Sequence, residues 1–150
     1  MTILISVYSM FGNTKRLADA MADALRKNAT VNVVPFEKMT AADFAQANLI
    51  IVGSATQAFG IPPQVQPILK KLPMGSINGT PCATYDTAIK MVPFRYLTAA
   101  KKLTKELQRL GGTTIDTPMS FFVKGKKGPL LDGEIERAQV WASTLLSFTR

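Results

Sequence analysis

Residues 8–14 read Tyr8-Ser9-Met10-Phe11-Gly12-Asn13-Thr14, between an apolar run at residues 3–7 and a helical run at residues 15–27. A loop of small and hydroxyl residues at this place presents unpaired backbone N–H groups at a helix N-terminus, and such groups favour an anion. Ser9, Asn13 and Thr14 add side-chain donors, and Gly12 permits a close backbone approach. We interpret the stretch as a phosphate site. The alternative is an ordinary strand-to-helix turn with Thr14 near the cap.

The stretch differs from the two best-known nucleotide loops. It has neither the lysine of a Walker loop nor the three-glycine spacing of a dinucleotide fingerprint, so ATP and NAD are not the expected ligands. The absent lysine predicts a phosphate that is bound mainly by hydrogen bonds. The chain contains no histidine, which excludes His-dependent triads and histidine-ligated zinc. We expect no catalytic side chain and no metal site, and we interpret Cys82 as a buried, inert thiol.

The composition is that of one globular domain. The chain has 150 residues, of which 47% are hydrophobic and 19% charged, and this suits a single domain over residues 1–150. No apolar run is long enough to span a bilayer, and no charged segment precedes an apolar signal core. These features predict a cytoplasmic protein without a membrane partner.

The net charge is +8, from 18 Lys and Arg against 10 Asp and Glu. A basic surface of this kind attracts an acidic protein, a nucleic acid or a phosphorylated small molecule. The alternative is a solvated helix face with a lysine-rich loop at residues 124–129. No aromatic residues are interleaved with the lysines, so nucleic acid is the least expected partner.

Apolar segments of strand length alternate with segments of helical periodicity. The predicted strands are residues 3–8, 31–34, 49–52, 81–85 and 113–116. The predicted helices are residues 15–27, a short helix at 40–47 capped by Thr40, one that starts near 62–63, one that ends at 111–112, and one that begins at Asp132. This alternation predicts an α/β fold with a parallel sheet covered on both faces. Residues 119–123 are also strand-like, within an irregular segment.

Three loops leave the carboxyl ends of these strands, where ligands of open parallel sheets bind: residues 9–14, 54–60 and 86–97. Together they resemble the three flavin loops of the flavodoxin family. The first matches the family's pattern T/S-x-T/S-G-N-T, except that Phe11 replaces a hydroxyl residue and removes one phosphate donor. The resemblance covers essentially the whole chain and implies a three-layer sandwich with a five-stranded sheet of order 2-1-3-4-5.

The second loop, Gly53-Ser54-Ala55-Thr56-Gln57-Ala58-Phe59-Gly60-Ile61-Pro62-Pro63, looks like the family's G-S-P-T-x-x-F-G-x-P-P segment. The resemblance implies that Thr56 and Gln57 contact ribityl or phosphate oxygens and that the backbone of residues 58–60 follows the flavin ring. In the third loop we expect Tyr85 and Asp86 to line the site, with Phe94 or Tyr96 either stacking on the ring or anchoring the loop. The implied FMN-binding residues are Ser9, Met10, Phe11, Gly12, Asn13, Thr14, Thr56, Gln57, Ala58, Phe59, Gly60, Tyr85 and Asp86.

The resemblance implies an FMN-binding electron carrier that takes electrons from a reductase and passes them on singly. The cofactor then carries the redox chemistry, and the protein supplies position and local charge. Its expected partners are redox proteins, including ones with acidic surfaces, and a monomer is the favoured state. Two alternatives remain. One is an FMN-dependent NAD(P)H:quinone-type oxidoreductase, and the other is a flavin-free binding module that uses the basic surface.

Overall fold

The computed structural model of the protein describes residues 1–56, 60–90 and 99–149. Its strands are β1 (Thr2–Tyr8), β2 (Thr30–Pro35), β3 (Leu49–Ala55), β4 (Pro81–Ile89), β5 (Thr113–Thr114) and β6 (Met119–Val123). Its helices are α1 (Asn13–Leu25), α2 (Ala41–Ala45), α3 (Val65–Lys70), α4 (Ala99–Arg109) and α5 (Glu134–Leu145), with 3-10 turns η1 (Phe36–Lys38) and η3 (Leu146–Phe148). None of the helices in these ranges is long and apolar enough to cross a membrane.

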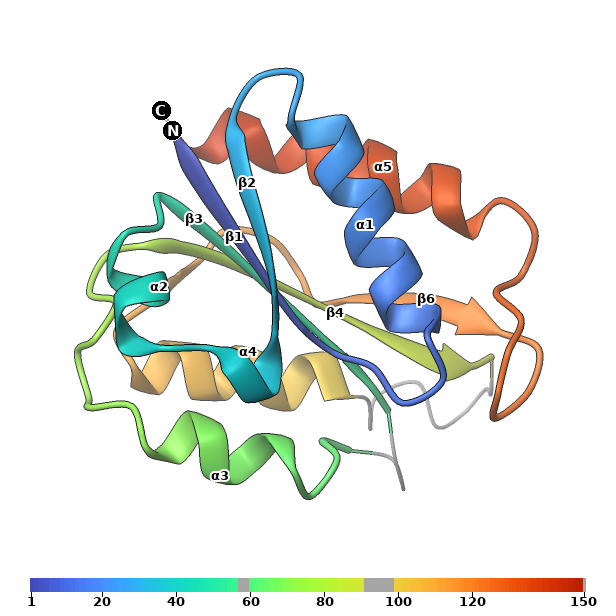
Figure 1. The fold of residues 1–150 in the computed structure, drawn as a ribbon, viewed down its shortest axis with the longest axis horizontal. Coiled ribbons are helices and arrows are strands. Elements are labelled where there is room, and N and C mark those ends of the chain that lie inside the picture. The colour runs from blue at the N-terminus through green and yellow to red at the C-terminus, as the bar shows by residue number, and fades with distance from the viewer. Residues whose placement is uncertain (57–59, 91–98, 150) are drawn as a thin grey trace.

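The strands form one sheet between two layers of helices (Figure 1). Helices α1 and α5 pack on one face of the sheet, and α2, α3 and α4 pack on the other. The strand order is β2-β1-β3-β4-β5 with parallel pairing throughout, which confirms the predicted α/β architecture.

The edge of the sheet beside β4 differs from the prediction. Only Thr113–Thr114 pair with the start of β4, and β6 pairs in parallel with its second half. Between the pairs Cys82–Thr114 and Tyr85–Met119 the edge contains two more residues than β4 does, so β5 and β6 are two segments of one interrupted strand. Pro118, just before β6, has no N–H for the ladder. The predicted strand at 113–116 is therefore wrong in extent.

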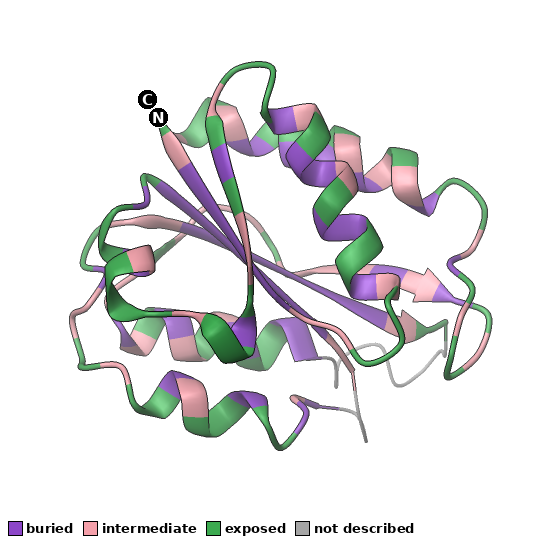
Figure 2. Cartoon of the chain, in the orientation of Figure 1, coloured by how far each residue is buried: buried purple, intermediate pink, exposed green. Residues whose placement is uncertain are grey.

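The side chains of the sheet alternate between two apolar cores. Ile3 and Ile5 face the core under α1 and α5, whereas Leu4 faces the core over α2, α3 and α4. Because both faces are covered, buried residues run along nearly the whole length of the central strands (Figure 2). Cys82 lies in the second core, and burial raises the pKa of its thiol to about 12, which agrees with an inert cysteine.

Local sequence signals explain where the helices begin. Thr40 caps α2 as predicted, in a reciprocal pair with Asp43. Helix α5 begins at Glu134 rather than at Asp132, because Gly133 takes a left-handed conformation immediately before it.

Connections from adjacent strands leave the sheet in opposite directions. β1 leads into α1 on one face, and its neighbour β3 leads toward α3 on the other. This reversal opens a crevice beyond the carboxyl ends of the strands, the place where open α/β sheets bind ligands.

Candidate functional site

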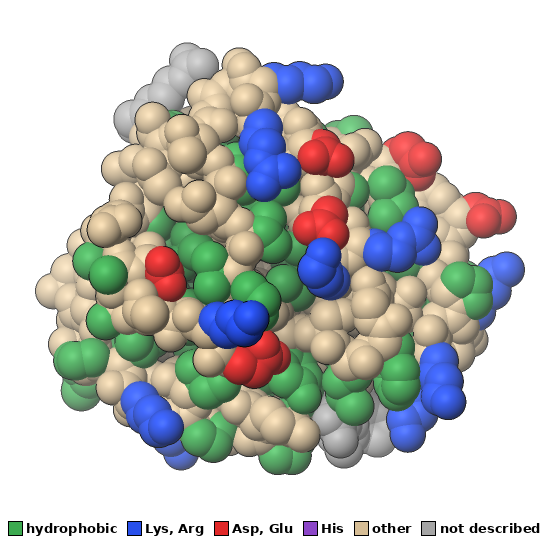
Figure 3. All heavy atoms as spheres, viewed as in Figure 1, with side chains coloured by type: hydrophobic (Ala, Val, Ile, Leu, Met, Phe, Trp, Pro, Cys, Tyr) green, Lys and Arg blue, Asp and Glu red, His purple; other side chains and the backbone are tan. Residues whose placement is uncertain are grey.

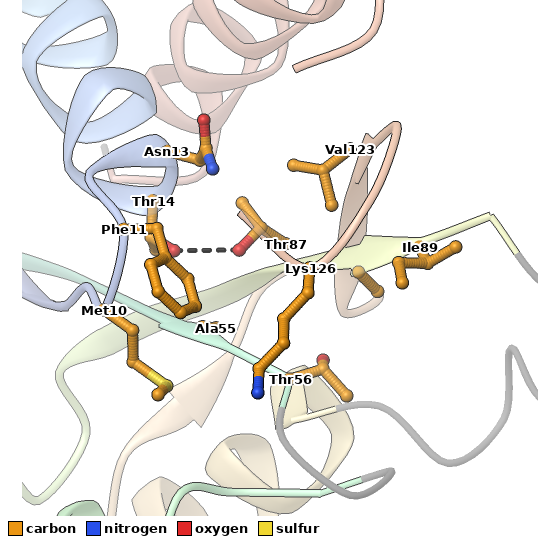
Figure 4. A pocket seen from close by; sticks show the side chains of 11 residues that line it. Met10, Phe11, Asn13, Thr14, Ala55, Thr56, Thr87, Ile89, Val123 and Lys126 are labelled. Atoms are coloured by element: carbon orange, nitrogen blue, oxygen red, sulfur yellow. Dashed lines mark hydrogen bonds between the residues drawn. The ribbon is translucent and has the colours of Figure 1, made fainter. Parts of the chain in front are cut away.

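A cavity of about 370 Å³ lies beyond the carboxyl ends of β1, β3 and β4 (Figure 4). Its walls come from the loop after β1, the end of β3, the end of β4 and the loop after β6. The lining residues are Met10, Phe11, Asn13, Thr14, Ala55, Thr56, Thr87, Ala88, Ile89, Val123 and Lys126. The size falls within the range of small-molecule sites.

The loop between β1 and α1 directs backbone donors outward. Gly12 has a φ of 89° and precedes the first turn of α1, a conformation that glycine adopts without strain. In the part of the chain that the structure describes, the backbone N–H groups of Asn13 and Thr14 meet no acceptor. The positive end of α1 and these donors form a site for an anion.

Ser9 stabilises this loop from within. Its hydroxyl oxygen accepts hydrogen bonds from the N–H of Gly12 at 3.1 Å and of Lys15 at 3.4 Å. Ser9 does not line the cavity but lies in a separate hollow on the β2 side of the loop, beside Val33 and Glu37. It therefore shapes the loop.

Two threonine hydroxyls meet at the inner wall of the cavity. Thr14 Oγ1 and Thr87 Oγ1 are 2.8 Å apart, and both side chains are buried. Only one of the two hydroxyl protons is used in this bond, and among the described residues the other has no acceptor. That proton remains for a ligand, in addition to the backbone donors.

Tyr85 and Asp86 do not line the cavity, which corrects the prediction made for them. Both are fully buried, because β4 continues four residues past Tyr85 and its end supplies Thr87, Ala88 and Ile89 instead. Asp86 Oδ2 accepts a hydrogen bond from the N–H of Ala100 at 2.9 Å, in the first turn of α4.

Tyr85 supports the first turn of α1 from within the core. Its hydroxyl donates a hydrogen bond to the carbonyl of Thr14 at 2.9 Å, and its ring packs edge-on against Phe121 and Trp141. Burial, together with the negative charge of Asp19, raises the pKa of the Tyr85 phenol, so the hydroxyl keeps its proton and remains a donor. Tyr85 therefore connects the core to the first turn of α1.

The second loop is described only at its ends. Thr56 lines the cavity, donates its N–H to the carbonyl of Thr87 at 2.9 Å and accepts a hydrogen bond from the N–H of Ala99 at 3.2 Å. Gly60 is buried beside α4, where a Cβ would lie 2.8 Å from Lys102 Nζ. The remaining predicted residues, Gln57, Ala58 and Phe59 here and Phe94 and Tyr96 in the third loop, lie outside the described residues.

The sequence analysis missed the residues contributed by the end of β4 and by the lysine-rich loop. Thr87, Ala88 and Ile89 follow the polar residue Asp86, and a search for apolar runs ends before it. Lys126 is more than 100 residues from the first loop in sequence and is the one charged residue among the described residues of the lining. Strand-like residues 119–123 were the available signal, since a loop that follows an edge strand reaches the same end of the sheet.

These features fit FMN at its phosphate end and along part of its ring. The first turn of α1 supplies donors for a phosphate, and the side chains of Phe11, Ile89 and Val123 supply an apolar wall. In the described residues no three His, Cys, Asp or Glu side chains lie close enough to hold a metal ion.

Comparisons with known proteins agree with this fold. The sequence model of one protein family, described as flavodoxin, matches residues 5–141. Flavodoxin 2 from Bacillus cereus superposes with a TM-score of 0.82 at 19% identity, and a Streptococcus pneumoniae TIGR4 flavodoxin with 0.81 at 21%, each comparison covering 99% of both chains. Rubredoxin oxygen:oxidoreductase from Desulfovibrio gigas has a TM-score of 0.75 at 21% identity, covering 99% of this chain and 36% of that one. No curated protein matches in sequence at a significant level.

Proposed function

Because the chain belongs to the flavodoxin family, whose members bind FMN, we propose that it is an FMN-binding electron carrier that accepts electrons from a reductase and passes them on singly. The observation that carries the proposal is the pair of N–H donors at Asn13 and Thr14, which stand at the positive end of α1 beside the cavity. FMN, when bound, supplies the redox chemistry. The protein would bind the cofactor and shield it from water.

Three sets of residues would hold the cofactor. The first turn of α1 and the Thr14–Thr87 hydroxyl pair would donate hydrogen bonds to the phosphate. Thr56, at the end of β3, would face the ribityl chain. Apolar side chains at Phe11 and Ile89 would exclude water along the ring.

The charge distribution supports an acidic redox partner. In the sequence, residues 44–115 hold eight Lys and Arg against two Asp and Glu, whereas residues 1–43 and 116–150 each hold five against four. Of the two acidic residues, Asp86 is buried and Glu106 is bound to Arg109 at 3.0 Å. Six of the eight basic residues lie in α4, in α3 or next to α3: Lys70, Lys71, Lys101, Lys102, Lys105 and Arg109. The basic excess of the described residues therefore falls on the α3–α4 layer, while acidic and basic side chains alternate over α1 (Figure 3). A partner with an acidic surface fits this layer.

The first turn of α4 connects that layer to the cavity, because Ala99 is bonded to Thr56 and Lys102 lies against Gly60. A protein docked on the basic layer would thus stand near the cofactor. All described strands share one sheet, which supports a single domain over residues 1–150.

The visible absorption spectrum tests the proposal. The purified protein is measured as isolated, then after incubation with FMN and removal of free flavin, and finally after addition of NADPH. We expect bound flavin that NADPH leaves oxidised. Prompt bleaching of the flavin by NADPH would indicate an NAD(P)H-dependent reductase instead of a carrier. Failure to retain FMN would overturn both and leave the flavin-free binding module.

A further inference from the structure

Residues 124–129, which we call the lysine loop, form a closed turn after β6. The N–H of Lys124 donates to the carbonyl of Pro129, and the N–H of Gly128 donates to the carbonyl of Gly125, both at 2.9 Å. Val123 and Leu130 pair as an antiparallel bridge at the base of the turn. These bonds give the backbone of the loop a defined shape.

The lysine loop is attached to the first turn of α1. Asn13 Nδ2 donates a hydrogen bond to the carbonyl of Lys127 at 3.2 Å. Gly128 has a φ of 100°, and a Cβ at this position would lie 2.6 Å from Asn13 Nδ2, so glycine is needed both for the conformation and for the close approach. The loop therefore lies directly against the helix end that carries the N–H donors of Asn13 and Thr14.

Of the three lysines, Lys126 alone faces the cavity. All three lysines are exposed, but Lys126 belongs to the lining and its side chain extends across the cavity in Figure 4, whereas Lys124 and Lys127 are not part of the lining. An ammonium group in a concave, partly apolar site attracts an anion more strongly than one in open water does.

We propose that Lys126 binds the phosphate of the ligand in this cavity. The proposal rests on the proposed function and adds to it a cationic residue from outside the β1–α1 loop. The first turn of α1 supplies N–H donors, and Lys126 supplies a positive charge from the lysine loop, which is bonded to that turn through Asn13. The ligand class is a phosphate monoester dianion attached to a flat apolar group. The phosphate is thus held by hydrogen bonds and by one formal charge.

Two ligands and two matched variants test this. FMN and riboflavin share the ring and the ribityl chain and differ in the phosphate. Lys126→Gln removes the cavity lysine, and Lys127→Gln removes a neighbouring exposed lysine of the same loop. Dissociation constants of both flavins are measured by fluorescence quenching for the wild type and for both variants, at low and at high salt.

We expect Lys126→Gln to weaken FMN about 10-fold at low salt, as for the loss of a charge-assisted hydrogen bond, and to leave riboflavin affinity unchanged. Lys127→Gln should change FMN affinity by less than about 2-fold. Added salt should weaken FMN binding more in the wild type than in Lys126→Gln. Lys126→Arg should retain most of the affinity, because it keeps the charge.

Equal losses in the two glutamine variants would overturn the inference, as would an equal loss for riboflavin and FMN in Lys126→Gln. In either case a wild type that binds FMN leaves the proposed function intact. A wild type that binds neither flavin would overturn the proposed function and this inference together.

Discussion

The two helical layers of the molecule differ in how they are connected to the cavity. The α1–α5 layer encloses an aromatic core in which Tyr85, Phe121 and Trp141 meet edge-on at centroid distances of 5.9–6.1 Å. From that core the Tyr85 hydroxyl reaches the carbonyl of Thr14 in the first turn of α1. The α3–α4 layer has a largely aliphatic core around Leu103 and Leu107 and carries the excess of lysines on its outer surface.

We therefore expect the two layers to have different roles. Packing in the α1–α5 layer supports the first turn of α1, where we propose that the phosphate binds, so a core change there should alter both stability and ligand affinity. A core change in the α3–α4 layer should alter stability alone, and a surface change there should alter encounters with other molecules. Variants made in pairs, one in each layer, test this difference.

The largest change in stability is expected from substitutions in the two cores. Phe121→Ala should lower the free energy of unfolding by about 3–5 kcal/mol, because a fully buried ring is removed and a cavity remains. Leu107→Ala, in the other core, should lower it by about 2–5 kcal/mol. Chemical denaturation measures both. FMN affinity should fall only in Phe121→Ala, which removes a neighbour of Tyr85, and equal affinities in the two folded variants would contradict the comparison.

A smaller change in stability is expected when Glu134 is replaced, because this residue connects α5 to β6. Glu134 Oε2 accepts hydrogen bonds from the N–H of Phe122 at 2.8 Å and from Arg137 at 2.7 Å. Burial raises the pKa of Glu134, but the hydrogen bonds from Arg137 and Phe122, with the positive charges of Arg137 and Lys90, outweigh it and hold the pKa below its ordinary value of 4.5. Glu134→Gln should cost about 1.5–3 kcal/mol at neutral pH.

The lowered pKa of Glu134 predicts how the stability of the fold depends on pH. A carboxyl whose pKa is lower in the folded state stabilises the fold above its unfolded pKa, and the contribution disappears as the pH falls through the folded pKa. The stability difference between the wild type and Glu134→Gln should therefore narrow below pH 4.5. Glu106→Gln, which breaks the α4 pair with Arg109, should cost at most about 1 kcal/mol. A constant difference for Glu134→Gln down to acid unfolding would contradict the assignment.

A third pair of variants removes one hydroxyl group on each side of the sheet. Tyr85→Phe removes the donor to the Thr14 carbonyl, and Thr84→Val removes the donor to the Ala100 carbonyl at 3.0 Å. Each should cost about 1 kcal/mol of stability. Titration with FMN should show weaker binding in Tyr85→Phe alone. Unchanged FMN affinity in Tyr85→Phe would show that the Tyr85 bond supports the fold without positioning α1.

The sequence predicted β1 and the position of the β1–α1 loop well, because an apolar strand followed by small and hydroxyl residues is a local signal, whereas the sheet order followed from the resemblance to the flavodoxin family. It misplaced the end of β4, since Asp86 and Thr87 interrupt the apolar run. In the structure these polar residues remain in the strand because partners elsewhere in the chain satisfy them, the Ala100 N–H for Asp86 and the Thr14 hydroxyl for Thr87. Lys126 reaches the cavity only through the pairing of β6 with β4, a contact between distant segments that no local pattern encodes.

The smallest expected effect concerns the outer surface of the α3–α4 layer. Lys102 and Lys105 are exposed on α4, and Lys102 lies against Gly60 near the cavity. The double variant Lys102→Glu/Lys105→Glu reverses two charges of the basic layer, and Lys27→Glu, after the end of α1, is the control on the other side of the sheet.

The readout is the oxidation of the reduced, FMN-loaded protein by ferricyanide, an anion, and by hexaammineruthenium(III), a cation. At low salt the double variant should react several-fold more slowly with ferricyanide and faster with the ruthenium complex, because surface charge steers encounter. The differences should disappear at high salt, where the charges are screened. Opposite shifts with the two reagents separate a change in surface field from a change in flavin potential, since a change in potential would move both rates in the same direction. If Lys27→Glu had the same effect as the double variant, net charge rather than the α3–α4 layer would control access to the cofactor.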